Sequence, residues 1–414
     1  MKRNIFILTT LALIFIGCGG RGERRTGNPA GTAPVEEDIV VISKIKPIVN
    51  VYIENSGSMD GYVDGGVTEF EDAIHNYLVD MGLSGVTDTL NLFYINSHII
   101  PQGSDVSAFI KDLTPASFRA KGGNRGTSDI ADVFKSILAE TDENDISILV
   151  TDGIFSPGKG KPAGPYLVGQ QTEIKNTMGK YLELNPNTAL IIYQLSSQFN
   201  GVYYNREDYK TTINTQRPYY IWVIGDIKHL NNLRNKVPDS KFKGGGVQNL
   251  FSITNGKQKV DYAVKMGSGN FKLDNKSPKN TIVNLRKDTK GKHNEVKFSV
   301  NANLSGFLLD DAYLLDDLNY VMNNNNYAFN IKKAPSNNHG YTHLFDLSSD
   351  NVHKGKISIK LKSHIPQWVE DINDDDGSEH VEGKTYGIKH QVHGVYEAFT
   401  FTDNSYTEII ININ

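Results

Sequence analysis

Cysteine is almost absent from this sequence. The chain of 414 residues holds a single cysteine, Cys18, so it can form no disulfide within itself and no zinc site built from several cysteines. An excess of positive charge is also missing, because the formal net charge is −4. Proteins that bind nucleic acid through its phosphates need a basic surface, so this charge balance argues against a nucleic-acid partner.

Long apolar runs are missing as well, except at the start of the chain. Residues 1–18 begin with Lys2 and Arg3, continue with a mainly apolar segment and end with a small residue before Cys18. Such a segment is short for a membrane-spanning helix, and the order of its parts is typical of a signal peptide. The pattern resembles a bacterial lipoprotein signal, although Phe15 stands where that family usually has Leu.

The resemblance implies that Cys18 is acylated and becomes the mature N-terminus. The alternative is an uncleaved anchor helix, and both interpretations tether the protein to a bacterial membrane, on its periplasmic or cell-surface side. Residues 19–38 are rich in Gly, Pro and charge and offer almost nothing to bury. We therefore expect a flexible linker between the anchor and the folded part.

Residues 39–240 alternate between strand-like and helical patterns, which predicts an α/β domain. The expected strands are KPIVNVYIE, DTLNLFYIN, DISILVTDG, TALIIYQLS and YYIWVIG, the last beginning near Arg217. The expected helices are TEFEDAIHNYLVDMGL, SDIADVFKSILAE, QQTEIKNTMGKYLEL and IKHLNNLRNKV. Nearly continuous apolar strands between helices predict a doubly wound, mainly parallel sheet that is covered on both faces.

Residues 245–414 have a different pattern and predict a mostly β domain. Short alternating runs such as NEVKFSVNANL, KGKISIKLK and YTEIIININ are typical of antiparallel strands packed on one face, as in a sandwich. The run EDINDDDGSEHVE, residues 370–382, is interpreted as a solvated acidic loop between strands. The run KHQVHG, with His390 and His393, is interpreted as the exposed end of a strand.

Three polar clusters follow the first α/β segments. Glu54, Ser56 and Ser58 alternate directly after the first strand, Thr127 and Ser128 precede a helix, and Asp152 follows the third strand. In open α/β sheets ligands bind at the carboxyl ends of the strands. Carboxylates and hydroxyls without histidine or thiolate favour Mg²⁺, Mn²⁺ or Ca²⁺ over zinc or copper.

These clusters resemble the metal-ion-dependent adhesion site (MIDAS) of a von Willebrand factor A (vWA) domain. The family motif begins Asp-x-Ser-x-Ser, and this chain has Glu54 at the first position. The resemblance implies that Ser56 and Ser58 bind the metal and that Asp152 completes its coordination. It also implies a loop hydroxyl, supplied by Thr127 or by Ser128. The extra methylene of Glu54 leaves open whether the carboxylate binds directly or weakens the site.

In that family the open metal position takes a carboxylate of a protein partner. The resemblance therefore predicts a membrane-anchored lipoprotein that binds a protein or another macromolecule through a divalent cation, in the manner of adhesion. The second hypothesis is a metal-free scaffold whose β domain makes the contacts. A metal-assisted hydrolase is the third, but NSGSM lacks the Gly-x-Ser-x-Gly motif, so we expect no enzyme.

Overall fold

The computed structural model of the protein describes residues 46–414, except 127–128, 158–159, 275, 289–293 and 337–339. These described residues belong to one compact unit, Ile45–Asn414. The predicted signal peptide, its Cys18 and the predicted linker lie outside them. Within the described part, no helix has both the length and the apolar character needed to cross a membrane.

The largest element is a seven-stranded sheet in the order β3-β2-β1-β4-β6-β5-β7. Its strands are β1 (Ile48–Glu54), β2 (Thr89–Ile95), β3 (Ile99–Gly103), β4 (Ile146–Thr151), β5 (Thr188–Tyr204), β6 (Lys210–Asp226) and β7 (Asn249–Thr254). Strand β1 pairs in parallel with β2 on one side and with β4 on the other. The remaining pairs are antiparallel.

The prediction of a mainly parallel sheet is therefore wrong. Within this described sheet only the two pairings of β1 are parallel, whereas edge strand β3 and the half that contains β6, β5 and β7 pair in antiparallel fashion. Strands β5 and β6 form one long hairpin, whose register runs from the pair Thr188–Asp226 to the pair Tyr204–Lys210. Their apolar runs look like parallel strands because helices cover both faces of this half too. The fold class is mixed α/β, with further β sheets.

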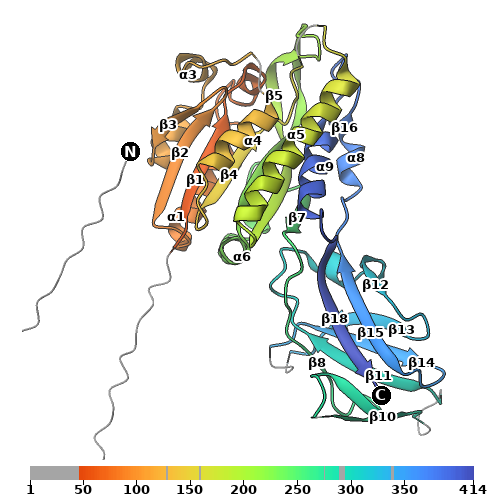
Figure 1. The fold of residues 1–414 in the computed structure, drawn as a ribbon. Coiled ribbons are helices and arrows are strands. Elements are labelled where there is room, and N and C mark those ends of the chain that lie inside the picture. The colour runs from red at the N-terminus through yellow and green to blue at the C-terminus, as the bar shows by residue number, and fades with distance from the viewer. Residues whose placement is uncertain (1–45, 127–128, 158–159, 275, 289–293, 337–339) are drawn as a thin grey trace, which may run out of the picture. The chain divides into compact units, whose positions relative to one another are not determined.

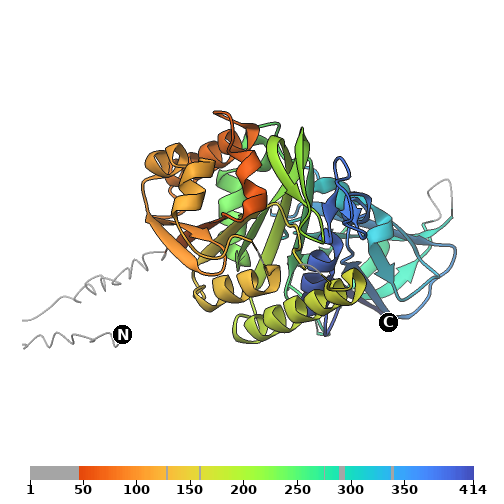
Figure 2. The same ribbon diagram turned by 90° about the horizontal axis from the view of Figure 1, so that it is seen from above.

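Helices lie on both faces of the large sheet, as predicted (Figure 2). One face packs against α1 (Glu69–Ser84), α2 (Val106–Lys111), α3 (Pro115–Ala120) and α6 (Ile227–Lys236). The other packs against α4 (Ile130–Ala139), α5 (Ala163–Leu184) and α9 (Ile388–Phe399). Local sequence sets the start of α1, where Thr68 and Glu71 form a capping box that satisfies free backbone N–H groups.

Two further sheets form the β-rich part. One has the order β12-β15-β18-β10-β9 and the other β13-β14-β11-β8. Their strands are β8 (Tyr262–Val264), β9 (Asn270–Leu273), β10 (Thr281–Arg286), β11 (Val296–Ala302), β12 (Tyr320–Met322), β13 (Ala328–Lys333), β14 (His343–Ser349), β15 (Gly355–Lys362) and β18 (Ser405–Ile413). Side chains of both sheets, such as Phe298 and Ile411, share one hydrophobic core. The predicted strands NEVKFSVNANL, KGKISIKLK and YTEIIININ are confirmed as β11, β15 and β18.

Short elements complete the chain. They are the 3-10 helices η1 (Gly57–Tyr62), η2 (Asp239–Lys241) and η3 (Asp317–Asn319), the helices α7 (Asp311–Leu315) and α8 (Trp368–Asp371), and the strands β16 (Asn373–Asp374) and β17 (Thr385–Tyr386). Of these, η1 follows β1 directly and lies at the carboxyl edge of the large sheet.

The chain returns from the β-rich part to the large sheet between β15 and β18. Helix α9 packs beside α5 (Figure 1), where Gln171 Nε2 donates to Glu397 Oε1 at 2.6 Å and Lys175 lies 2.9 Å from the same carboxylate. The interpretation of KHQVHG as an exposed strand end is wrong, because His390 and His393 belong to this helix. Val392 and Val395, on its other face, are fully buried in the core of the α/β part.

Candidate functional site

The predicted site residues meet where β1 and β4 end side by side. Ile53 pairs with Val150 in parallel register, so Glu54 and Asp152 follow at the same edge of the sheet. The chain continues from β1 to β2 on one side, whereas β4 lies on the other side of β1. The gap between β1 and β4 is therefore a topological switch point, the place where α/β sheets bind ligands. Glu54, Ser56 and Asp152 are all buried there.

The two serines lie together at the start of η1. Their hydroxyl oxygens are 3.0 Å apart, at hydrogen-bond distance. Ser56 occupies the N-cap position of η1, but its side chain makes no capping bond to the helix. The hydroxyls of Ser56 and Ser58 therefore lie beside each other at this edge, and their binding to one ligand stays a prediction.

Asp152 is fully buried, with 0% of its surface exposed. The backbone N–H of Ile154 donates to its Oδ1 at 3.2 Å, whereas its Oδ2 has no hydrogen-bond partner in the described part of the chain. Burial raises the pKa of this carboxyl above its ordinary value, and Arg217, Ile154 N–H and the Ser58 hydroxyl oppose that shift without cancelling it. A buried carboxylate oxygen without a donor favours a proton or a cation.

Thr151 links Glu54 to the turn after β4 through hydrogen bonds. Its hydroxyl donates to Glu54 Oε2 and accepts from the backbone N–H of Gly153 at 2.9 Å. Gly153 has a φ of +67° and its missing Cβ would lie 3.0 Å from the Tyr220 ring, so the turn after β4 requires glycine. The sequence indicated the TDG motif but not this bond to Glu54.

Arg217 is a member of the site that sequence analysis missed. Its side chain on β6 is 1% exposed, and its Nη2 lies 4.0 Å from Asp152 Oδ2. The guanidinium carbon lies 4.7 Å from the centre of the Phe199 ring, 5.2 Å from that of Tyr203 and 5.8 Å from that of Tyr62. Cation–π attraction to these rings stabilises a buried positive charge beside Asp152.

Arg125 is a second residue that the sequence did not reveal. Its Nε donates to the carbonyl of Asn55 at 2.7 Å, its Nη2 donates to that of Ser56 at 3.1 Å, and it forms an ion pair with Asp60. The backbone N–H of Gly57 returns a bond to the Arg125 carbonyl at 2.9 Å. These contacts hold the loop before α4 against η1. Thr127 and Ser128, the predicted loop ligands, follow in this loop but lie outside the described residues.

The donor chemistry of the site fits a hard divalent cation. Two buried carboxylates and two hydroxyls offer oxygen only, and one of those oxygens, Asp152 Oδ2, accepts no hydrogen bond from a described residue. Considering described residues alone, no group of three or more His, Cys, Asp or Glu side chains could hold a metal ion. A cation would therefore depend on the serine hydroxyls and on at least one ligand beyond these four side chains.

The acidic run 370–382 lies against the tip of the β5–β6 hairpin. Arg206 forms an ion pair with Asp376 at 2.6 Å, and Asn205 Nδ2 donates to the carbonyl of Ser378 at 2.7 Å. The ring of His380 packs edge-on to Tyr203, one of the rings around Arg217. This stretch is therefore part of the hairpin's support, although several of its acidic side chains remain exposed.

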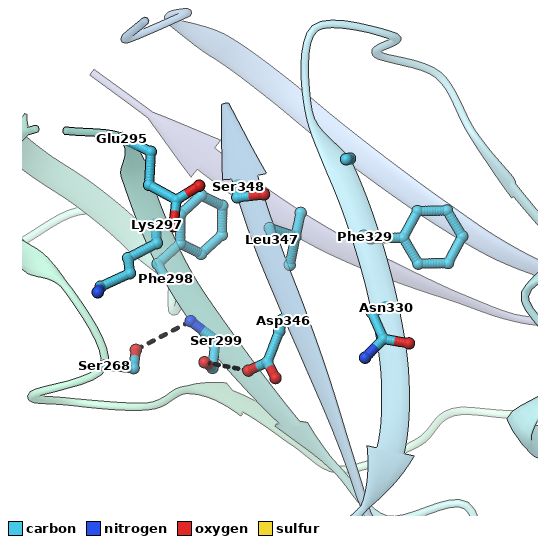
Figure 3. Close-up of a pocket in the computed structure, with 11 residues that line it drawn as sticks. Ser268, Glu295, Lys297, Phe298, Ser299, Phe329, Asn330, Asp346, Leu347 and Ser348 are labelled. Carbon is cyan, nitrogen blue, oxygen red and sulfur yellow. Dashed lines mark hydrogen bonds between the residues drawn. The ribbon is translucent and has the colours of Figure 1, made fainter. Parts of the chain in front are cut away.

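A separate hollow of about 410 Å³ lies on the sheet that contains β11, β13 and β14 (Figure 3). Three of its polar residues are bonded to each other: Ser299 Oγ donates to Asp346 Oδ1 at 2.6 Å, and Ser299 N–H donates to Ser268 Oγ at 2.9 Å. Lys332 lies 2.5 Å from the other oxygen of Asp346. Since these groups satisfy one another, the hollow offers a ligand less than the edge of β1 and β4 does.

Comparisons of this chain with protein-family models, with curated proteins and with solved structures find no match.

Proposed function

We propose that this protein binds a partner protein through a divalent cation held at the edge of β1 and β4. The observation that carries the proposal is the buried Oδ2 of Asp152, which has no hydrogen-bond partner among the described residues. It belongs to the same edge as the hydroxyls of Ser56 and Ser58 and the carboxylate of Glu54. Oxygen donors of this kind are the ligands that Mg²⁺, Mn²⁺ and Ca²⁺ prefer.

The similarity of IENSGSM and ILVTDG to the MIDAS motif of vWA domains supports this proposal. Under it, residues 39–240 belong to a vWA-type domain that β7 and α9 complete. Ser56 and Ser58 bind the cation, and Asp152 binds it directly or through water. Glu54 takes the place of the usual Asp, and Thr127 or Ser128 adds the loop hydroxyl. The cation would supply an open coordination position for a carboxylate of the partner.

Charge also favours an anionic group of the partner. Glu54 and Asp152, when ionised, carry two negative charges, and Arg217 carries one positive charge. A divalent cation would leave this set with one excess positive charge, which a partner carboxylate would neutralise. Under the proposal, the acylated Cys18 holds the protein at a bacterial membrane, on the periplasmic or cell-surface side, where the partner is met.

Arg217 also favours a second candidate function, a metal-free scaffold. A guanidinium 4.0 Å from Asp152 Oδ2 already supplies positive charge to the site. In that case the contacts with a partner come from the β-rich part. No observation on the described residues favours a hydrolase. Nδ1 of His98 lies 3.0 Å from Ser97 Oγ, and the hydroxyls of Ser56 and Ser58 are at hydrogen-bond distance from each other.

Thermal stability in the presence of cations tests the proposed function. A ligand that binds only the folded protein at about 100 times its Kd stabilises it by about 2.7 kcal/mol. We expect Mg²⁺, Mn²⁺ or Ca²⁺ to raise the melting temperature and EDTA to reverse the rise. The variant Asp152→Asn should lose the effect. A melting temperature that no cation changes would favour the scaffold.

A further inference from the structure

We propose that Arg217 regulates the cation affinity of this site. Its positive charge stays beside Asp152 and lowers the affinity of the site for a cation. The inference rests on the proposed function and adds a regulatory residue to it. It starts from the position of the guanidinium, whose Nη2 lies 4.0 Å from Asp152 Oδ2 with both side chains 1% exposed.

Water cannot screen this pair well. Arg217 and Asp152 rank among the most buried polar side chains of the described residues, and Nε and Nη1 of Arg217 have no hydrogen-bond partner. A buried guanidinium with unsatisfied N–H groups is costly, so its attraction to Asp152 and to the rings of Phe199, Tyr203 and Tyr62 has to stabilise it. Arg217 therefore depends on the charge that a cation would compete for.

The backbone around Arg217 prevents the side chain from moving away easily. Arg217 pairs with Ser197 in the long β5–β6 hairpin, and the Tyr62 hydroxyl donates to the carbonyl of Pro218 at 2.6 Å. A Cβ added to Gly201 would lie 2.8 Å from the Cα of Gly61, so the hairpin and η1 are in direct backbone contact. The positive charge thus stays near Asp152 whether or not a cation is present.

A fixed positive charge lowers the affinity of the site for a cation. With an effective dielectric constant of about 20, a unit charge within about 10 Å of a divalent cation reduces its affinity by at least about tenfold before screening. The same charge attracts an anion. The site is thereby biased against holding a cation alone and toward holding one together with an anionic group of a partner.

The test is calorimetric titration of the purified full-length chain with Mn²⁺, comparing the wild type with Arg217→Met. Methionine keeps an unbranched side chain among the three rings but removes the charge. We expect the Kd for Mn²⁺ to fall by at least about tenfold. Arg217→Lys keeps a positive charge and should bind close to the wild type, which separates charge from shape. Should Arg217→Met fail to fold, Arg217→Gln takes its place.

A matched control is Arg234→Met. Arg234 lies near the end of α6 and also forms an ion pair with an aspartate, Asp239, at 2.5 Å. Arg234→Met therefore removes one positive charge, as Arg217→Met does, but leaves the candidate site unchanged. Its Kd should equal that of the wild type.

The outcomes separate the inference from the proposed function. Tighter binding by the neutral variant supports the inference, also when the wild type binds too weakly to measure. Unchanged or weaker binding by a folded neutral variant, with binding by the wild type, overturns the inference alone. No binding by either protein overturns both.

Discussion

At Gly61 the backbone of η1 lies directly against the β5–β6 hairpin. A Cβ at this position would collide with the ring of Phe199, which also packs on Arg217. Position 61 therefore has no space for a side chain larger than that of glycine. The surrounding sequence, SMDGY, is by contrast typical of an ordinary turn. The packing of the candidate site depends on this close approach.

We expect Gly61→Ala to lower the free energy of unfolding by about 1–3 kcal/mol, the range for overpacked sites. Denaturant-induced unfolding measures it. Gly169→Ala in α5 is the control, because a Cβ there would meet no described atom within 4 Å outside the backbone of its own helix and its chain neighbours. Alanine there should be neutral or stabilising by up to about 1 kcal/mol. Equal stability of Gly61→Ala and the wild type would contradict the close contact.

Single residues also show how far sequence reasoning extends. Glu54, Ser56, Ser58 and Asp152 could be predicted because each follows an apolar strand within a few positions, and parallel strands bring such ends together. Arg217 could not, because it reaches the site through the antiparallel pairing of β6 with β4, in which Thr151 lies opposite Tyr220. Nothing local in TQRPYY distinguishes a buried arginine from an exposed one at a strand start.

At the scale of elements, α9 is the longest described helix that sequence analysis missed. The run IKHQVHGVYEAF contains β-branched and aromatic residues between polar ones, and short runs of this kind do not distinguish a strand from a helix. In the structure its apolar face completes the core beside α4 and α5, and Gln391 Nε2 donates to the carbonyl of Gly153 at 2.5 Å. The helix thus supports the turn after β4 that carries Asp152.

We expect Val392→Ala to destabilise the protein by about 2 kcal/mol, because Val392 is 0% exposed and its methyl groups leave a cavity. Val168→Ala on the neighbouring α5 is the matched control, since Val168 is 57% exposed, and it should change stability by less than about 0.5 kcal/mol. Chemical denaturation measures the free energy of unfolding of both variants and of the wild type. Equal effects would mean that α9 does not belong to this core.

Strand β18 carries an ion pair with a defined pH dependence. Glu408 accepts a hydrogen bond from Ser358 and lies 3.1 Å from Lys257, and these contacts, the Ser358 bond first, lower the pKa of Glu408 below its ordinary value. A lowered pKa stabilises the folded state above the unfolded pKa of about 4.3. That stabilisation is lost as the pH falls through the lower, folded-state pKa.

We therefore expect Glu408→Gln to reduce stability by about 0.5–1 kcal/mol at pH 7 and by much less near pH 3, because the wild-type carboxyl is then protonated too. Urea unfolding at both pH values measures the difference. Glu143→Gln, at an exposed turn before β4, should have little effect at either pH. A cost for Glu408→Gln that does not shrink in acid would contradict the lowered pKa.

At the scale of the whole molecule, the predicted boundary near residue 240 does not coincide with a break in packing. Strand β7 pairs with β5 in the large sheet, and α9 packs against α5, although both follow that boundary. The described residues accordingly form one compact unit. The change in composition after Pro238 indicated a change of strand type. It could not reveal that β7 and α9 pack against the large sheet and its helices.

A chain that ends at residue 240 should therefore not fold cooperatively. It would lack β7 and α9 and would expose buried side chains such as Ile192 and Ile174. We expect loss of the near-ultraviolet circular dichroism and no sharp thermal transition. A chain that lacks residues 1–35 keeps the compact unit and should unfold cooperatively. A sharp transition in the shorter chain would show that residues 39–240 fold alone.

The central claim is that oxygen ligands at the edge of β1 and β4 hold a divalent cation, and calorimetric titration tests it most directly. The wild-type chain is titrated with Mg²⁺, Mn²⁺ and Ca²⁺ beside the double variant Ser56→Ala/Ser58→Ala. Ser147→Ala is the control, because it removes a buried hydroxyl that bonds Thr141 at the other end of β4. All of these proteins should keep a cooperative thermal transition.

The account predicts saturable binding at one site in the wild type and in Ser147→Ala, and no binding in the double variant. Binding that survives the loss of both hydroxyls, or no binding of any of the three cations by the wild type, would contradict it.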